Sequence, residues 1–571
     1  MPRLGARTGI RRPRTAWRTA VTAVLMPVGL LALAGNARAD VITDVNNVLL
    51  NIIVNTSPVL IDGPPTVARE IAMVNGAMYN AVNALGGGSS ASAQAAVLSA
   101  GFSVMNGLYG AGSLYDQYKG VTGSAFFGAG SPYAGTLVGP SLTQYAAITA
   151  GLNSVAAELN ALGAAAPVAA GTAIGSAAGA AMIAARANDG SYGPTGAMLS
   201  TLSYTAPPGS GTVAGVYIPP AARPALEPNA GAVAPFVIGQ TTLNTLTSKV
   251  PGPAALTQQP YALQVLQTEC QGASVGLPAN VAAACAANHF APQTTGQAAA
   301  ALYWNDPGGT YQPPGHWLQI ADIVAGSQGL DLLHHAQEDA LVGAAMSDAG
   351  SAVWAVKFAG NRWRPITAIK DCNTWNAFFT TCDPTWNSLI ATPPHPDYLA
   401  GHPGFSGAAA TVLTNFFGSG DIPFVSVSQA YCNAGGSIRD AAGNTIGCTR
   451  GGISYSIENA GDCNNAETQP VLNSDFTANP LYNASPLICP ISETFAGFAD
   501  ASSGAFGSIF SRVAGGIHTP QAVFDALALG NAIGQAVANA SGIPEPGTLA
   551  MLSAALAALG IKRRRTTGCH G

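Results

Sequence analysis

Apolar residues recur at intervals of three and four over much of the chain, which is the spacing of one face of an α-helix. Between Thr66 and Leu85 this spacing predicts an amphipathic helix, with apolar side chains at Ile71, Val74, Met78, Val82 and Leu85. Helices are also expected within residues 91–108, 143–187, 318–359 and 404–417. Alternation of apolar and polar residues is scarce, so few strands are expected. The pattern predicts an all-α fold.

Proline and glycine interrupt this helical pattern in several places. Residues 204–236 contain seven prolines and are expected to form a long surface loop. Residues 432–489 are rich in glycine, asparagine and serine and are expected to form another. We interpret residues 40–540 as one all-α domain of helical bundles with long loops. Its N-terminal helical part extends to about residue 340, and its second part covers about 341–540.

The composition is typical of a chain with a large folded core. Of 571 residues, 48% are apolar and only 9% are charged, whereas disordered chains combine low hydrophobicity with high net charge. The net charge is −5, and Lys and Arg form no internal run. We therefore expect no nucleic-acid partner.

The first 39 residues have the layout of a secretory signal peptide. Several arginines precede the apolar stretch 20–35, and the small-x-small sequence Ala-Arg-Ala follows and ends at Ala39. The alternative is a membrane anchor, but the stretch is short and contains Pro27 and Gly29. Export of a mature chain that begins near Asp40 is expected.

The C-terminal residues 541–571 also have the layout of a signal. Pro544-Glu545-Pro546 precedes an apolar stretch over 549–561, and Lys562 and three arginines follow it. This order of parts resembles the PEP-CTERM sorting signal of Gram-negative bacteria, although an ordinary tail helix is the alternative. The resemblance implies processing by an exosortase, a final place at the cell surface or outside the cell, and only transient membrane contact through the two terminal signals.

Eight cysteines precede the tail, and an even number in an exported chain predicts disulfides. They are Cys270, Cys285, Cys372, Cys382, Cys432, Cys448, Cys463 and Cys489. None belongs to a Cys-x-x-Cys pair, so a zinc site is not expected. Pairing between sequence neighbours is our hypothesis, and it would pin the long loops.

Three short segments carry candidate chemistry, and the first is "KFAGNRWRP". Lys357 and Arg364 are seven residues apart, which would place them on one face of a helix. Pro365 disfavours further helix and places Arg364 at the end of an element. An ammonium and a guanidinium aimed at one point suit an oxyanion. The alternative is a solvated basic face.

The second and third segments each place a histidine at a helix start. His402 follows Gly401 and precedes Pro403, which is suited to the first position of an apolar helix. His518 precedes a Thr-Pro pair that suits a helix cap, and Arg512 lies six residues before it. Unpaired N–H groups at a helix start bind anions, and a histidine there can transfer protons. In each case, the alternative is a structural histidine.

In order, the three segments resemble the signature of the superfamily of vanadium-dependent haloperoxidases and type 2 phosphatidic acid phosphatases: K-x6-R-P, P-S-G-H and S-R-x5-H-x3-D. The first is complete here, the second keeps Gly401 and His402, and the third keeps Ser511, Arg512 and His518. Stretches such as "YWNDPGGTYQPPGHW" and "HPDYLAGHPGFSGAA" extend the likeness from about Arg69 to Gly534.

The resemblance implies an enzyme that uses vanadate, hydrogen peroxide and halide. His518 would be the vanadium ligand, or the phosphorylated residue of a phosphatase. Lys357, Arg364 and Arg512 would bind the oxyanion oxygens, Gly401 would donate its backbone N–H, and His402 would be the acid–base residue. Lys357 would also polarise the peroxide.

Two departures from the signature bear on this function. Ala400 replaces the serine, which removes one hydrogen bond worth on the order of 1.5–3 kcal/mol. Ala522 replaces the aspartate, and the nearest acid, Asp525, need not reach His518. The second loss weakens the phosphatase hypothesis more than the vanadate one. A non-catalytic surface protein with a degenerate site is the other alternative.

His395 lies seven residues before His402. In bromide-oxidising relatives a histidine has this spacing, whereas a chloride-oxidising one has an aromatic residue. Bromide or iodide is therefore the expected halide, unless His395 only braces its proline-rich loop. His334, His335 and Glu338 could suggest a metal pair, but the pattern is unspecific, so structural or surface roles are expected for them. A structural loop role is expected for His316. Trp363 is expected to pack beside the site.

Overall fold

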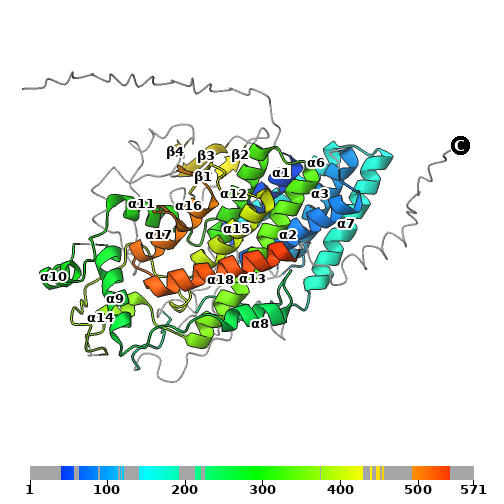
Figure 1. The fold of residues 1–571 in the computed structure, drawn as a ribbon. Coiled ribbons are helices and arrows are strands. Elements are labelled where there is room, and N and C mark those ends of the chain that lie inside the picture. The colour runs from blue at the N-terminus through cyan, green and yellow to red at the C-terminus, as the bar shows by residue number, and fades with distance from the viewer. Residues whose placement is uncertain are drawn as a thin grey trace, which may run out of the picture. The chain divides into compact units, whose positions relative to one another are not determined.

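The computed structural model describes most of the chain between the two predicted signals (Figure 1). The described residues are 40–56, 63–87, 90–113, 116, 119–120, 141–191, 213–219, 225–274, 276–372, 375–428, 437–439, 445–450, 453–455 and 492–540. The predictions for the signal peptide (1–39) and for the sorting tail (541–571) lie outside them.

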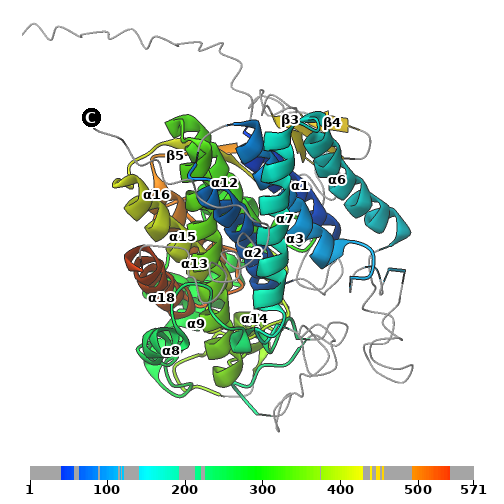
Figure 2. The same ribbon diagram turned by 90° about the vertical axis from the view of Figure 1, so that its right-hand side faces the viewer.

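The N-terminal half is a bundle of long helices. They are α1 (Val41–Thr56), α2 (Pro64–Ala84), α3 (Ala91–Tyr109), α6 (Leu142–Ala161), α7 (Ala166–Arg186), α12 (Gln312–Gln328) and α13 (Leu332–Gly360). Figures 1 and 2 show α2 alongside α13, and α2, α3 and α7 pack against one another. Their apolar faces form one continuous core, as the helical spacing of the sequence predicts.

A second group of helices packs against α13. Helix α15 (Gly401–Phe417) lies against α18 (Pro520–Asn539), and both contact α13. The shorter elements are η1 (Ala230–Ala232), α8 (Gln240–Ser248), α9 (Gln259–Gly272), α10 (Ala279–Ala287), α11 (Thr295–Tyr303), α14 (Pro365–Lys370), α16 (Phe498–Ser503) and α17 (Ser508–Ala514). Because α13 contacts both groups of helices, it connects the two halves.

Strands form only two small antiparallel sheets within the described residues. Strand β1 (Phe424–Val427) pairs with β5 (Ser492–Phe495), with Phe424 opposite Phe495. A second sheet has the order β2 (Ser437–Arg439), β3 (Thr445–Arg450), β4 (Ile453–Tyr455), and lies within the segment 432–489 that was predicted to be a loop. The all-α prediction is confirmed, since both sheets are minor.

Two of the predicted helical segments are each divided in two. The 143–187 segment breaks between α6 and α7, where Gly163 has φ +83°. The 318–359 segment breaks between α12 and α13, where Gly329 ends α12 in the left-handed conformation. Both glycines adopt a conformation that is costly for other residues, so they end the helices. His316 lies in α12, so its predicted place in a loop is wrong.

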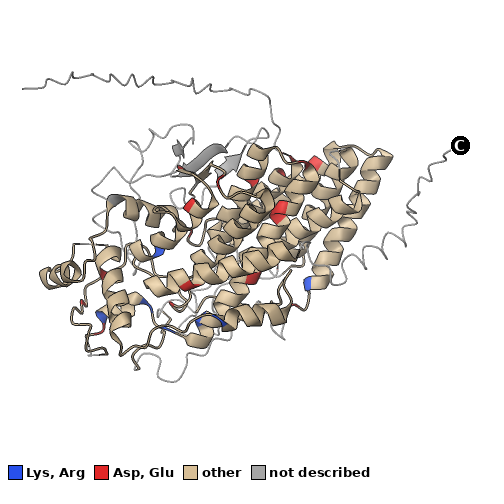
Figure 3. Cartoon of the chain, viewed as in Figure 1, with Lys and Arg blue, Asp and Glu red and all other residues tan. Residues whose placement is uncertain are grey.

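Among the described helices, α7 alone is long and apolar enough to cross a membrane. It packs against α3, and Gly175 lies so close that a Cβ atom there would collide with the carbonyl oxygen of Ala96. The small residues of α7 therefore serve close helix packing. Figure 3 shows that charged residues are few along the helices, in keeping with their packing against one another.

Two of the predicted disulfides are present. Cys270 pairs with Cys285 and ties α9 to α10, and Cys372 pairs with Cys382 after α14. Both join sequence neighbours, as expected. The remaining pairs, among Cys432, Cys448, Cys463 and Cys489, involve side chains outside the described part of the chain.

Candidate functional site

The predicted site residues meet where several helices begin or end. Lys357 lies in the last turn of α13, and Arg364 directly precedes α14. His402 lies in the first turn of α15, Arg512 lies in α17, and His518 lies just before α18. The three cations are buried, with at most 2% of their surface exposed. The structure thus gathers three buried positive side chains and the buried His518 beside His402, whose side chain is 13% exposed.

Lys357 and Arg364 do not share a helix face, so that part of the prediction is wrong. Helix α13 ends at Gly360, because Asn361 adopts the left-handed conformation (φ 44°) and its N–H donates to the Lys357 carbonyl at 2.8 Å. Arg362 then forms an antiparallel bridge with Val216. The extended backbone after α13, and not a shared helix face, therefore brings Arg364 to the site.

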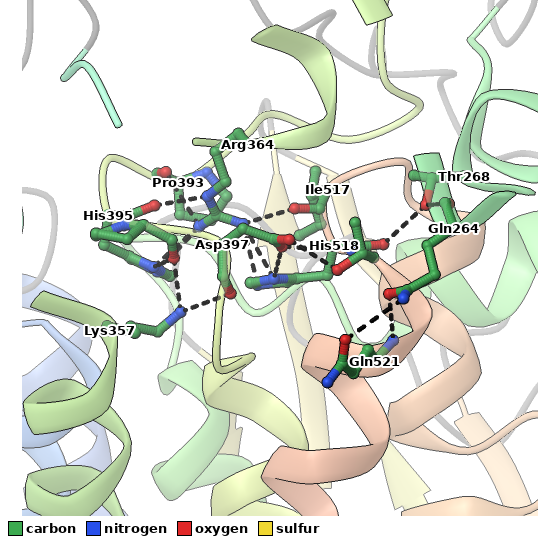
Figure 4. Close-up of polar contacts among 12 residues, drawn as sticks. Gln264, Thr268, Lys357, Arg364, Pro393, His395, Asp397, Ile517, His518 and Gln521 are labelled. Atoms are coloured by element: carbon green, nitrogen blue, oxygen red, sulfur yellow. Dashed lines mark hydrogen bonds and ion pairs between the residues drawn. The ribbon is translucent and has the colours of Figure 1, made fainter. Parts of the chain in front are cut away.

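Arg364 is held by hydrogen bonds from all three of its nitrogen atoms (Figure 4). Its Nε donates to the His395 carbonyl at 2.6 Å, and its Nη1 to the Ile517 carbonyl at 2.6 Å. Its Nη2 reaches the Pro393 carbonyl at 3.2 Å. The remaining contacts are to ring nitrogens, Nη1 to His518 Nε2 at 3.0 Å and Nη2 to His395 Nδ1 at 2.9 Å. The guanidinium is therefore fixed between His518 and His395.

His518 is oriented by a carboxylate. Its Nδ1 lies 2.7 Å from Asp397 Oδ1, while its Nε2 faces Arg364. A carboxylate can only accept, so Nδ1 carries the proton that is donated to Asp397 and Nε2 keeps its lone pair. Arg364 Nη1, which is 3.0 Å from Nε2 and 3.4 Å from Nδ1, lies over the imidazole ring. Thr519 also donates to Asp397, from Oγ1 to Oδ2 at 2.8 Å and from its backbone N–H at 3.3 Å. This is the tautomer in which Nε2 can bind a metal or attack phosphorus.

Thr519 occupies the capping position of α18, as predicted, but its side chain serves Asp397 and does not cap the helix. The start of α18 is instead anchored on α9. The His518 carbonyl accepts from Thr268 Oγ1 at 3.3 Å, and the Gln521 N–H donates to Gln264 Oε1 at 3.2 Å (Figure 4). These contacts fix the backbone that carries His518.

Lys357 points at the segment that carries Asp397. Its Nζ donates to the carbonyl oxygens of Pro396 at 2.9 Å and of Asp397 at 3.4 Å. Burial, and then the nearby Arg364 guanidinium, lower the pKa of Lys357 well below its ordinary value. An anion bound beside Lys357 would favour its charged form.

Helix α15 begins at Gly401, two residues earlier than the predicted first position at Pro403. A Cβ atom at Gly401 would lie 3.2 Å from the ring of Trp354, so glycine lets the helix start pack closely on that ring. Ala400 is fully buried, and its N–H donates to the Ala522 carbonyl at 2.9 Å. Ala400 and Ala522, the two residues that depart from the signature, are therefore joined by a backbone hydrogen bond.

His402 and Arg512 each have a buried nitrogen without a hydrogen-bond partner among the described residues. These atoms are His402 Nε2 and Arg512 Nη1. The nearest acid to His402 is Asp306, whose Oδ2 lies 3.7 Å from Nε2, beyond hydrogen-bonding distance. Asp306 instead bonds His316, whose Nδ1 is 3.2 Å from Oδ1. Arg512 also donates from Nη2 to the Trp304 carbonyl.

The electrostatics of the site keep its histidines neutral. Burial first, and then neighbouring cations, lower the pKa values of His395, His402 and His518 well below the ordinary value. Burial raises the pKa of Asp397 to about 6, although Arg364 acts against the rise. Neutral imidazoles beside three cations can accept protons or bind a metal, and the cations attract an oxyanion.

The structure also places the secondary candidates. Asp525 accepts from Tyr398 Oη at 2.8 Å and from Gln521 Nε2 at 3.1 Å, whereas the carboxylate on His518 is that of Asp397. Trp363 packs in a second apolar cluster behind Arg364 and donates from Nε1 to Tyr261 Oη at 2.7 Å.

Sequence reasoning missed Asp397 and Asp306 as functional candidates. Both lie in the family-like stretches, in "HPDY" and in "WNDPGG", and an acid beside a motif histidine was the available signal. Of the remaining histidines, His334 is exposed, as expected, whereas His335 and Glu338 are buried in a separate cluster.

Known proteins show the same fold. Residues 339–542 match the family model of the VCPO second helical-bundle domain. A bacterial vanadium-dependent iodoperoxidase is 17% identical over 89% of this chain and 97% of that one, with a TM-score of 0.55. A bacterial vanadium-dependent chloroperoxidase in its holo form is 13% identical, with a TM-score of 0.52 over 88% and 95% of the two chains.

No curated protein sequence matches the chain. At 13–17% identity the two structural relatives establish the fold and leave the activity open. The matched residues include the predicted site residues, from Lys357 to His518, and Asp397, whereas Asp306 precedes them. Residues 339–542 therefore match the VCPO second helical-bundle domain, and the chain has the helical fold of the vanadium-dependent haloperoxidases.

Proposed function

We propose that this protein is a vanadate-dependent haloperoxidase, which oxidises halide with hydrogen peroxide. The observation that carries the proposal is the state of His518. Its Nδ1 lies 2.7 Å from Asp397 Oδ1, where it donates to the carboxylate and leaves a lone pair on Nε2, and three buried cations lie near the ring. A ring nitrogen prepared in this way, beside fixed positive charge, suits a metal oxyanion.

The residues present fit vanadate. Arg512 Nη1 is a buried donor that has no hydrogen-bond partner in the described chain, and an oxyanion would accept from it. His402 Nε2 has no such partner either, so it would be available to exchange a proton with the bound group. Lys357, Arg364 and Arg512 would offset its negative charge, and the N–H groups at the start of α15 would add donors. His518 Nε2 would be the ligand to vanadium.

Bound vanadate supplies a Lewis-acidic centre that activates hydrogen peroxide for attack by halide. The protein's own part is to bind, orient and move protons. His402 stays neutral, because burial and then Arg512 lower its pKa, so its Nε2 can accept a proton from the incoming peroxide. Lys357 would place positive charge beside the peroxide oxygens, and Arg364 would hold His518 in register.

For the halide, we propose bromide or iodide in preference to chloride. His395 adds a second imidazole, bonded to Arg364 Nη2 at 2.9 Å and lying 5.0 Å from the Trp354 ring, centroid to centroid. Ala400 offers no hydroxyl to the oxyanion. Both features favour a weaker oxidant than one that turns over chloride.

A phosphatase is the second candidate, and Asp397 is the observation that favours it. The loss of the signature aspartate at Ala522 counted against a phosphorylated histidine. Asp397 now provides a carboxylate on Nδ1 of His518, which would stabilise the positive charge on such an intermediate. The same cations would bind a phosphate ester.

We also propose that the protein is exported and then processed by an exosortase, so that it works at the cell surface or outside the cell. The layout of both chain ends supports this proposal. The two disulfides support it as well, because disulfides persist in oxidising compartments.

The decisive experiment measures peroxide-dependent halogenation of an organic acceptor by the purified protein, with and without orthovanadate. We expect activity only with vanadate, and competition by phosphate, because the two tetrahedral anions are alike in shape and charge. Turnover of phosphate esters without any vanadate-dependent halogenation would establish the phosphatase instead. Neither activity would indicate a non-catalytic surface protein.

A further inference from the structure

A second buried cluster of polar side chains lies at the far end of α13. It contains Asp322 from α12 and His335 and Asp339 from α13, all nearly inaccessible to solvent. Asn46 of α1 contacts both carboxylates. At 1.5 Å per residue, His335 is about 33 Å along the helix axis from Lys357. The cluster is therefore separate from the oxyanion site.

The polar atoms of the cluster converge on one point. His335 Nε2 lies 3.2 Å from Asp322 Oδ1 and 3.3 Å from Asp339 Oδ2. The Asn46 amide atom assigned as nitrogen lies 3.0 Å and 2.8 Å from the same two oxygens. Neighbouring ligands around a cation at about 2.1 Å are about 3 Å apart when their bonds meet at right angles. The four atoms have the spacing of a coordination shell.

A carboxylate orients His335 in the way that metal-bound histidines are oriented. Asp40 Oδ2 lies 2.7 Å from His335 Nδ1. With the proton on Nδ1, the Nε2 lone pair points at Asp322 and Asp339, which offer no proton when ionised. Without a cation this tautomer would leave three lone pairs facing one another. Carboxylate–histidine–metal arrangements have this form.

Several buried oxygen atoms of the cluster also have no hydrogen-bond partner in the described chain. They are Asn46 Oδ1, Asp339 Oδ1 and both carboxyl oxygens of Glu338. Glu338, the chain neighbour of Asp339, is fully buried. The nitrogen and oxygen of an asparagine amide can be exchanged, which would turn Asn46 Oδ1 toward the two aspartates. Such a concentration of buried acceptors is costly unless positive charge is present.

We propose that Asp322, His335, Asp339 and the amide oxygen of Asn46 bind one divalent transition-metal cation, such as Mn²⁺ or Zn²⁺. The single imidazole favours these ions over Ca²⁺ and Mg²⁺, which bind oxygen almost exclusively. The ligands come from α1, α12 and α13, so the ion would fasten the first helix of the described chain to the bundle. The site is structural and independent of the proposed halide chemistry.

The test is metal binding by the purified protein after treatment with a chelator and dialysis. We expect one equivalent of Mn²⁺ or Zn²⁺ by elemental analysis, and a rise in Tm when the metal is restored. Asp322→Asn and Asp339→Asn should each weaken binding by about tenfold or more, because each replaces an anionic ligand by a neutral one of the same shape. His334→Ala is the matched control, because this exposed neighbour bonds only Asp331 in the described structure and should bind metal normally.

The three histidines of the oxyanion site could also capture a metal, so His518→Ala is tested in parallel and should keep the full equivalent. Anomalous scattering from the wild-type protein locates the ion even if an Asp variant fails to fold. Stoichiometric metal at His335 supports the proposal. A wild-type protein that takes up no cation, or an ion located elsewhere, would overturn it and leave His335 as a protonated partner of the surrounding acids.

Discussion

The Nδ1 atom of His518 lies 2.7 Å from the carboxylate of Asp397, although 121 residues separate the two in the chain. This contact provides the kind of orientation that the resemblance implies for the signature aspartate, whose position is occupied by Ala522. Asp397 reaches His518 from the loop before α15, whereas the signature aspartate would have come from the first turn of α18. His518 is thus oriented by a carboxylate that comes from the loop before α15 and not from α18.

Replacement of Asp397 should weaken vanadate binding more than it affects folding. Asp397→Ala removes the acceptor for the Nδ1 proton, so we expect a vanadate affinity about 10- to 100-fold lower, as for other residues that orient a metal ligand. Asp397→Asn keeps the shape and should lose less. The measurement is calorimetric titration with orthovanadate.

Asp525→Asn is the matched control for that experiment, because Asp525 bonds Tyr398 and Gln521 in the structure. It should bind vanadate as the wild type does. Equal losses in the Asp397 and Asp525 variants would mean that Asp397 acts only through general stability, and the orienting role would be wrong.

His518→Ala and His402→Ala should separate binding from turnover. The first removes the proposed ligand to vanadium and should abolish tight binding. The second removes only a proton-transfer group, so binding should be largely kept while turnover falls by about 10²- to 10⁴-fold. Titration calorimetry combined with steady-state assays decides, and two variants that both bind vanadate like the wild type would contradict this division.

His395→Phe tests the source of the halide preference. The wild type should oxidise bromide and iodide, and chloride poorly or not at all. The variant loses the imidazole beside Arg364 Nη2 and should show a changed ranking. Assays with each halide at its own pH optimum measure this, and an unchanged ranking would exclude His395 as the cause. Efficient chloride oxidation by the wild type would refute the assignment itself.

Glu269 predicts a pH dependence of stability. Burial raises the pKa of Glu269 to about 8, while the hydrogen bond from Thr381 acts against the rise. Between its unfolded pKa, about 4.3, and about 8, the folded state holds a proton that the unfolded state has lost. This group therefore lowers stability as pH rises through that window, by up to about 1.4 kcal/mol per pH unit.

Glu269→Gln removes that titration. Relative to the wild type, the variant should gain stability steadily from about pH 4.5 to pH 8, with no further gain above it. Urea unfolding at several pH values measures the difference. A difference that is independent of pH would show that Glu269 is ionised in the folded protein.

Much of the fold follows from local sequence pattern. The apolar spacing predicts the bounds of α2, α3 and α15 to within about three residues, because a helix buries side chains three and four positions apart. The divisions between α6 and α7 and between α12 and α13 were missed, since a single glycine can be tolerated within a helix or can end it. The pairing of neighbouring cysteines was also predicted for the two disulfides that the structure describes.

By itself the sequence determined which side chains form the candidate site, because Lys357, Arg364, His402, Arg512 and His518 stand in three recognisable segments. Only the tertiary structure decided how they are held. The backbone turns after Lys357, and the bridge between Arg362 and Val216 leads it to Arg364 at the site. Asp397 orients His518 although the two residues lie far apart in the sequence. The cluster around His335 joins three helices in the same way. Spacing reports only on neighbours within a turn or two, whereas hydrogen bonds and charges act between whichever residues folding brings together.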